Sequence, residues 1–370
     1  MSYGTGAGWT PRLKRRGARL LNRYSADSLV GFCKNVFVKV GVDADKAHLV
    51  SDSMVKADLR GVSSHGVTRT RIYVDRIRRG LVDPKAEPEI IRERAATALL
   101  DAKNGIGQVV SRYAMEIAIK KAREAGVGFV GVAHSNHFGM AAYYTLQAVG
   151  EGMIGVAMTN APATMAPWGA RLPYMGTNPL SVAIPADKYL PVVLDMATSV
   201  VARGKIILAA QKGEKIPEGW AIDKEGRVTT DPKAALEGAV LPFGGPKGSA
   251  IAILIDVLSG ILTGASFGPH LGDLYRNFQD KQDIGHAFYA IDPASFGDAA
   301  VFKARIDQMI SEIKALPPAH GFDEVFLPGE IEFRNEERRR AEGVPLAEET
   351  EKDLIDLARE LGVAWPETLP

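Results

Sequence analysis

Three side chains that can bind and protonate an acid recur at every fourth position in a basic stretch after Gly61: His65, Arg69 and Tyr73. Ser64 is a good helix N-cap, and a helix beginning there places all three on one face, each about 40° further round than the last. An imidazole exchanges protons near neutral pH, and a guanidinium grips a carboxylate. The spacing favours a site for a small carboxylic acid, with a solvated basic face as the alternative.

Polar residues also follow several predicted strands, at positions where α/β proteins commonly hold ligands. Residues 134–139 read His-Ser-Asn-His-Phe-Gly between a strand and a helix, and we interpret this turn, which contains His137, as part of a site. Asn160 and Asn178 stand at two further strand ends, each close to a proline. Asx-type turns explain such asparagines as well as ligand binding does, so both interpretations stay open.

An acid and a lysine complete the set of candidates. Asp195 ends an apolar strand, where it can cap the next helix, as Thr198 and Ser199 also can, or orient a histidine and stabilise its imidazolium. Lys247 lies in a glycine-rich turn that begins a helix, as a phosphate-binding lysine does. The P-loop pattern is absent there, because neither Gly-Lys-Ser nor Gly-Lys-Thr occurs. A solvated lysine is therefore the alternative for Lys247.

Two well-known motifs fail in their context. Residues 126–131 match the G-x-G-x-x-G fingerprint of dinucleotide-binding domains, but a helix precedes them and a strand follows, the reverse of the required order. Gly126 is better interpreted as the residue that ends a helix. His134 and His137 are spaced like metal ligands, but no cysteine or carboxylate stands near them in the sequence. We therefore expect neither a Rossmann domain nor a metal site.

The composition is that of a soluble globular protein. The chain has 370 residues, 46% of them hydrophobic, and a formal net charge of +1, which argues against a nucleic-acid-binding face. Cys33 is the only cysteine, which fits a reducing compartment. No apolar run is long enough to span a membrane, and the arginines at positions 15–16 precede no apolar signal segment. We expect a cytoplasmic protein that binds neither membrane nor nucleic acid.

Helix signals dominate both ends of the chain, and strands alternate with helices between them. Residues 25–41, with Ser25 as N-cap, 43–60 and 330–361 are predicted to be helical, and residues 1–22 to be a flexible extension. The mixture of elements in between indicates an α/β core. Strands are expected at 96–101, 127–133, 154–160, 181–184, 192–195 and 288–292, and helices at 107–125, 141–151, 199–213, 247–265 and 302–316.

The ordered motifs together resemble the type II malate/L-lactate dehydrogenase family. That family includes ureidoglycolate and sulfolactate dehydrogenases, diketogulonate reductase and piperideine- or pyrroline-2-carboxylate reductases. The resemblance runs from about residue 24 to the C-terminus, and it is specific for the family but not for one substrate. Its motifs are Arg60-Gly61, Ser64-His65-Gly66 with Arg69 and Tyr73, and the segments 134–139, 165–169, 176–179, 195–199, 244–248, 285–288 and 327–330.

The resemblance implies an α/β fold with a non-Rossmann NAD(P)-binding central domain at residues 91–299. A helical domain would be formed by both chain termini, residues 23–90 and 300–370. It also implies a homodimer whose site lies between domains and near the dimer interface. The cofactor would be NAD or NADP, and no metal would be needed.

Residue roles carry over from the family at matching positions. His65 matches the acid/base histidine, and Asp195 matches the acid that works with it. Arg69 and Tyr73 match positions that hold a substrate carboxylate, and His137 matches one near both nicotinamide and substrate. The other matches are substrate positions, Asn160 and Lys247, and cofactor positions, Thr177, Asn178, Asp195, Met196, Ala197, Thr198 and Ser199.

The resemblance implies reversible hydride transfer between NAD(P)H and the carbonyl carbon of a small 2-oxo acid of malate or lactate type. His65 would protonate the carbonyl oxygen as an imidazolium and act as a neutral base in the reverse direction. Asp195 would raise the pKa of His65 if the two side chains meet. Reduction of a cyclic imino acid, such as piperideine-2-carboxylate, needs the same carboxylate grip and is an alternative, as are the ureidoglycolate and sulfolactate reactions. The presence of His65, Arg69, His137 and Asp195 argues against a non-catalytic binding protein.

Overall fold

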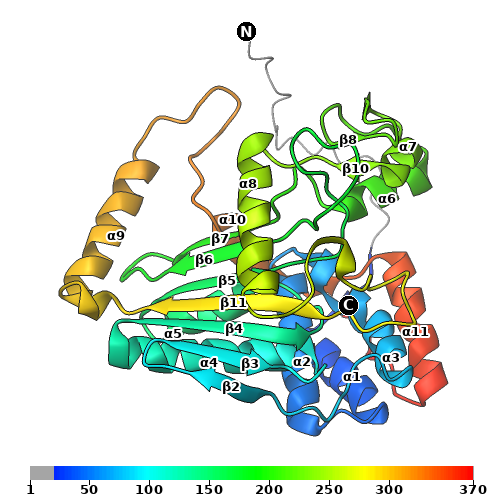
Figure 1. The fold of residues 1–370 in the computed structure, drawn as a ribbon, viewed down its shortest axis with the longest axis horizontal. Helices are drawn as coiled ribbons and strands as arrows, with labels where there is room; N and C mark the ends of the chain where they lie inside the picture. Colours follow the sequence, from blue (N-terminus) through cyan, green and yellow to red (C-terminus); the bar gives the residue numbers. More distant parts are fainter. Residues whose placement is uncertain (1–20, 370) are drawn as a thin grey trace.

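A seven-stranded mixed sheet forms the centre of the computed structural model, which describes residues 21–369 (Figure 1). The strand order is β2-β3-β4-β11-β5-β6-β7; β3 and β4 are parallel, and all other neighbours are antiparallel. The α/β class predicted from the sequence is thus confirmed. The strands are β2 (Glu89–Glu93), β3 (Thr97–Asp101), β4 (Val127–Ser135), β5 (Ile154–Thr159), β6 (Leu180–Ile184), β7 (Val192–Met196) and β11 (Ile284–Ile291).

Helices cover both faces of this sheet (Figure 1). α4 (Gly107–Ala125) and α5 (Ala142–Gly150) pack on one face through a buried apolar cluster. α8 (Pro246–Asp256) packs on the other face, where Ala287 of β11 points. α4 ends at Gly126 as predicted, because the φ of +81° at this residue is cheap only for glycine.

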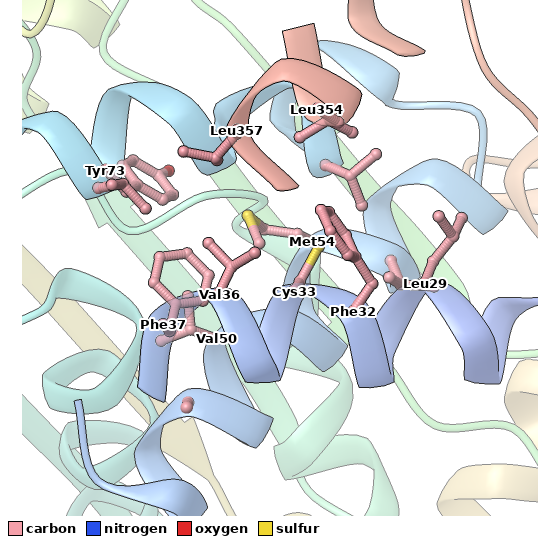
Figure 2. Packing of buried hydrophobic residues seen from close by; sticks show 14 of the residues in the cluster. Leu29, Phe32, Cys33, Val36, Phe37, Val50, Met54, Tyr73, Leu354 and Leu357 are labelled. Atoms are coloured by element: carbon pink, nitrogen blue, oxygen red, sulfur yellow. The ribbon is translucent and has the colours of Figure 1, made fainter. Parts of the chain in front are cut away.

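A cluster of helices from both ends of the chain lies beside the sheet (Figure 1). Ser25 begins α1 as predicted, since its hydroxyl accepts the Ser28 N–H at 3.1 Å, a cap worth about 1 kcal/mol. The buried side chains of α1 form one stripe, and Figure 2 shows them packing with Leu354 and Leu357 from the last helix. The cluster contains α1 (Ala26–Lys39), α2 (Ala44–Leu59), α3 (Thr70–Arg78) and α11 (Glu348–Leu361).

The C-terminal helical segment is interrupted, contrary to the prediction of one helical stretch at 330–361. α10 (Glu330–Glu342) ends at Gly343, whose φ of +87° breaks the helix, and α11 follows a short strand. That strand, β12 (Val344–Pro345), pairs with β1 (Arg23–Tyr24), so the first described residues also contain a strand that the sequence did not reveal. Asn22 is tied nearby, because its amide donates to Glu351 at 2.7 Å. The rest of the predicted N-terminal extension, residues 1–20, lies outside the described residues.

The remaining elements lie at the edges of the sheet. α9 (Ala299–Lys314) packs beside the turn between β6 and β7, where the Asp307 carboxylate accepts the N–H groups of Asp187 and Lys188 at 3.1 and 2.9 Å. The domain boundaries near residues 90 and 300 stay predictions.

A small sheet with two helices forms a further layer, made of β8 (Ala221–Ile222), β9 (Val228–Thr229), β10 (Ala239–Val240), α6 (Arg203–Lys212) and α7 (Pro232–Glu237).

Several element boundaries differ from the predictions. The helix expected at 199–213 begins only at Arg203, and α8 gives way after Asp256 to a π-helical turn at Val257–Ile261. β11 begins at Ile284, four residues before the expected start. No helix between residues 21 and 369 is both long and apolar enough to cross a membrane.

The prediction that a continuous helix begins at Ser64 is wrong. Two 3₁₀ turns, Ser63–His65 and Val67–Arg69, precede α3, and Gly66 between them is extended. The interruption lies at Gly66, whose ψ of −156° is not helical, and the Asp58 carboxylate of α2 holds the chain there by accepting the Val67 N–H at 2.7 Å. His65, Arg69 and Tyr73 therefore do not form one helical stripe.

Candidate active site

A cavity of about 470 Å³ lies where the helical cluster meets the end of β7. His65, Arg60, Asp195 and Glu332 contribute its ionisable groups. Apolar side chains form most of the remaining lining: Val62, Met140, Ala141, Ala142, Pro179, Val193, Leu194, Met196, Ala197, Ala202, Leu327, Pro328 and Ile331. A mainly apolar cavity of this size with a few polar groups is typical of a small-molecule or cofactor site.

One side of the site, called here the helical wall, consists of residues 60–73 with His137. The His65 and His137 rings stack, with 5.5 Å between centroids and 11° between planes. The Tyr73 hydroxyl lies 2.6 Å from Nδ1 of His137. The two 3₁₀ turns thus bring His65 and Tyr73 to the same partner, although the expected helix is absent.

Arg69 is held from two directions at the edge of this wall. Its Nε donates to the Ser64 carbonyl at 2.6 Å, and its guanidinium lies 5.1 Å from the centre of the Tyr275 ring. Arg76, which is buried, donates to the Asn277 carbonyl at 2.8 Å and so fixes the loop that carries Tyr275. Among the described residues no carboxylate forms an ion pair with Arg69, which leaves its charge available to an anion.

The two histidines and Tyr73 of the helical wall have pKa values shifted in the directions that favour their neutral forms. Burial, with a contribution from the Arg69 cation, lowers the pKa of His65 to about 3, and burial raises the pKa of Tyr73 to about 12. Burial also lowers the pKa of His137 well below its usual value. No hydrogen bond joins Asp195 and His65 in the described part of the chain, so the condition for the predicted rise in the pKa of His65 is not met in this structure, and burial and Arg69 determine its shift.

The opposite side, called here the sheet wall, consists of residues 193–197 with 139–142 and 327–329. Asp195 projects from β7, and its Oδ2 accepts the Ala142 N–H at 2.9 Å. It therefore caps α5 rather than the helix that follows it in sequence. Burial raises the pKa of Asp195 to about 6, although the Ala142 N–H and the Arg60 cation oppose the rise.

The other predicted site residues divide into two groups. Thr177, Met196 and Ala197 line the cavity, as do His65 and Asp195. Asn160, Asn178, Thr198, Ser199 and Lys247 are not part of its lining, and neither are Arg69, Tyr73 and His137 of the helical wall. The Thr198 hydroxyl donates to the Thr177 carbonyl at 3.0 Å, the Ser199 hydroxyl donates to the Val201 carbonyl at 2.8 Å, and Lys247 is exposed at the start of α8.

The two asparagines connect strand ends to one another. The Asn160 amide donates to Asp256 at 3.0 Å and to the Ser266 carbonyl at 2.8 Å, and its oxygen accepts the Gly285 N–H. Asn178 accepts the Ala161 N–H at 3.0 Å and donates to the carbonyl of Ala252 at 2.9 Å. These bonds reach distant backbone groups, so they are not the local Asx turns considered from the sequence. A ligand role for either asparagine stays a prediction.

Two charged groups of the cavity were not assigned a role from the sequence. Arg60 is buried, with its guanidinium 4.3 Å from the centre of the Phe333 ring and 3.5 Å from Glu336. Glu332 lines the cavity from α10. The motifs Arg60-Gly61 and Leu327 to Glu330 were signals for this region, but they named no function for these side chains. Between residues 21 and 369 no group of three or more potential ligands is arranged to hold a metal ion.

Comparison with known proteins gives the class and then the family. The sequence profile of malate/L-lactate dehydrogenases matches residues 24–355. L-sulfolactate dehydrogenase of Methanothermobacter thermautotrophicus is 43% identical over 341 residues, covering 92% of this chain and 98% of the relative. Malate dehydrogenase of Pyrococcus abyssi is 41% identical over 350 residues, covering 92% and 95%. The solved structure of sulfolactate dehydrogenase from Methanocaldococcus jannaschii superposes with a TM-score of 0.87 at 42% identity, covering 92% of this chain and 98% of that one.

These matches identify the protein as an oxidoreductase. The chain belongs to the malate/L-lactate dehydrogenase family, as its motifs predicted. The family uses NAD(P), and the names of two relatives specify different cofactors. They are ureidoglycolate dehydrogenase (NAD(+)) of Escherichia coli, 34% identical, and (2R)-3-sulfolactate dehydrogenase (NADP(+)) of Chromohalobacter salexigens, 38% identical.

Proposed function

We propose that this enzyme transfers a hydride between NAD(P) and a small 2-hydroxy/2-oxo acid of the malate or sulfolactate type. The observation that carries the proposal is the grouping of a neutral histidine, His65, which lines the cavity, with His137 stacked on it, Tyr73 bonded to His137, and Arg69 bonded to the Ser64 carbonyl. This wall offers a proton-exchanging group beside a cation that lacks an ion-pair partner. A 2-hydroxy acid presents a hydroxyl and a carboxylate to match those two groups.

The cavity has the chemistry that a nicotinamide cofactor requires. Its sheet wall is mainly apolar, which suits a flat ring, and Thr177, Met196 and Ala197 border it beside Asp195. When bound, the nicotinamide supplies or accepts the hydride. A Rossmann domain has a mostly parallel sheet, and its glycine motif follows a strand. In this protein the sheet is largely antiparallel and the glycine motif at 126–131 follows a helix, which supports a different way of binding the cofactor.

His65 would hold and move the proton of the substrate hydroxyl. Its depressed pKa leaves its ring unprotonated at pH 7, with a nitrogen free to accept that proton during oxidation. A substrate carboxylate bound to Arg69 would offset the positive charge that helps to depress this pKa, and so would favour the imidazolium needed for reduction. Substrate binding and proton affinity are thus coupled through Arg69. Asp195 would act on the cofactor side, because its carboxylate is held at the start of α5.

Arg60 supports an acid with a second anionic group. It is the cation among the lining residues, and malate and sulfolactate each carry a second acidic group. Lactate lacks one. The choice between NAD and NADP remains part of the proposal to be tested, as does a cyclic imino acid as the alternative substrate.

We also propose a homodimer in the cytoplasm. Several apolar side chains of α8 and the following turn are exposed, which is typical of a surface that another chain covers. They are Ile253, Leu254, Val257, Ile261 and Leu262. The single cysteine, Cys33, is buried and free, as is usual for proteins of reducing compartments.

A spectrophotometric panel tests the proposed function. Protein is mixed with NADH or NADPH and with oxaloacetate, sulfopyruvate, pyruvate, diketogulonate or piperideine-2-carboxylate, and absorbance of the reduced nicotinamide is followed. We expect the fastest oxidation with oxaloacetate or sulfopyruvate. Turnover of the imino acid alone would replace the proposal by its alternative, and no turnover with any acid would overturn both.

A further inference from the structure

Asp58, in the last turn of α2, is a buried acid outside the cavity whose side chain faces the segment that carries His65. It is 2% exposed. Its backbone carbonyl accepts a hydrogen bond from Arg339 of α10, whose charge also acts on its carboxylate, and this carboxylate bonds to the segment of the two 3₁₀ turns. The candidate reaction needs no such group, so its contacts require a separate explanation.

The carboxylate touches the chain on both sides of His65. Its Oδ2 accepts the Val67 N–H at 2.7 Å, and the Ser63 hydroxyl faces the same group. Gly66 lies directly against it, because a Cβ on this glycine would stand 2.2 Å from both carboxylate oxygens and from the carbon between them. Asp58 therefore holds the residues immediately before and after His65.

The Asp58 carboxylate is what a side chain at position 66 would meet first. Gly66 has φ −85°, which is not in the left-handed region that favours glycine. The three atoms nearest to an added Cβ all belong to the Asp58 side chain. The pair Asp58 and Gly66 is thus a complementary fit between α2 and the segment that carries His65.

We propose that Asp58 is a positioning residue, which sets the location of His65 against His137 and of Arg69 against Tyr275 by fixing the backbone at Gly66 and Val67. The inference rests on the proposed function for its kinetic consequence. A displacement of about 1 Å at a reacting group can cost about 10²-fold in rate. Asp58 itself touches neither cavity nor substrate.

A double-mutant cycle tests the packing. Gly66→Ala in the native background pushes the segment that carries His65 away from the Asp58 carboxylate. We expect it to lower Tm by about 3 °C or more. In an Asp58→Ala background the space is free, so the same substitution should lower Tm by less than about 1 °C. If Asp58→Ala does not fold, Asp58→Ser serves as the background. Equal costs of Gly66→Ala in both backgrounds would overturn the inference.

Kinetics distinguish positioning from a loss of stability. Asp58→Ala should lower kcat about 10²-fold on the best acid of the panel while NADH affinity, measured by fluorescence, changes less than about twofold. Asp58→Asn keeps the volume and an acceptor for Val67, and should recover most of kcat. Ser53→Ala is the matched control, because Ser53 is equally buried in α2 and bonds only within that helix, to the Val50 carbonyl.

The outcomes separate this inference from the proposed function. A kcat of Asp58→Ala equal to that of Ser53→Ala overturns positioning, even if both variants lose stability. A native protein that turns over no acid overturns the proposed function instead, and the Tm cycle then decides the inference alone.

Discussion

The two walls of the cavity are built in opposite ways. The helical wall consists of side chains that set one another's charge: the Arg69 cation helps to keep His65 neutral, and His137 lies between His65 and Tyr73. The sheet wall is mostly backbone and apolar side chains, with Asp195 as its one acid on β7. In the proposed function, proton exchange and anion binding are therefore assigned to the helical wall, and the sheet wall is assigned the shaped surface for the cofactor ring.

The sharpest way to break this comparison is to remove the imidazole. His65→Ala should lower kcat about 10²–10⁴-fold, the usual contribution of a positioned acid or base. NADH affinity should change less than about twofold, because the sheet wall is untouched. Stopped-flow rates and fluorescence titration measure the two quantities, and an unchanged kcat would exclude His65 from proton transfer.

Anion binding by the helical wall predicts a difference between two neighbouring arginines. Arg69→Ala should raise KM for the acid about 10²-fold, the cost of a lost charge-assisted contact. Arg71→Ala is the matched control, since Arg71 pairs with Asp353 and Glu360 at 2.8 and 2.9 Å on the far side of α3. It should change KM less than about twofold. Similar KM values for the two variants would show that Arg69 does not hold the carboxylate.

The acid of the sheet wall should appear in the pH dependence of stability. The pKa of Asp195 is about 6 in the folded protein, against 3.8 for the ordinary group. Between these values the folded state binds a proton that the unfolded chain releases, so this group destabilises the fold as pH rises from about 4 to 6. Asp195→Asn should therefore gain Tm relative to the native protein over that interval. A constant Tm difference between them from pH 4 to 7 would contradict the raised pKa.

The smallest effect is expected from Lys247, which lies on neither wall. Its exposed position predicts that Lys247→Ala changes KM for acid and cofactor less than about twofold. A tenfold rise in either KM would instead support the ligand role predicted from its glycine turn. Initial-rate kinetics at several cofactor concentrations distinguish the two results.

Local patterns revealed the central strands apart from β2, and most helices, because alternating apolar residues and caps such as Ser25 act within a few residues. They failed where a distant group decides the backbone. Asp58 holds the chain where the helix expected at Ser64 is interrupted, and β12 interrupts the C-terminal helix by pairing with β1. The spacing of His65, Arg69 and Tyr73 suggested one site through a helix that does not exist, and the structure instead joins His65 and Tyr73 through His137. The partner of Asp195 is Ala142, which is 53 residues away and invisible to local patterns.

The shared core of the two chain ends has a consequence for synthesis on the ribosome. Residues 24–82 pack against Val344, Leu354 and Leu357, so their core cannot close until about 260 further residues have been translated. At ordinary elongation rates the delay is roughly 13–50 s. The apolar stripe of α1 remains exposed to solvent during that time. The helical wall, which contains His65, is therefore the last part of the enzyme to fold.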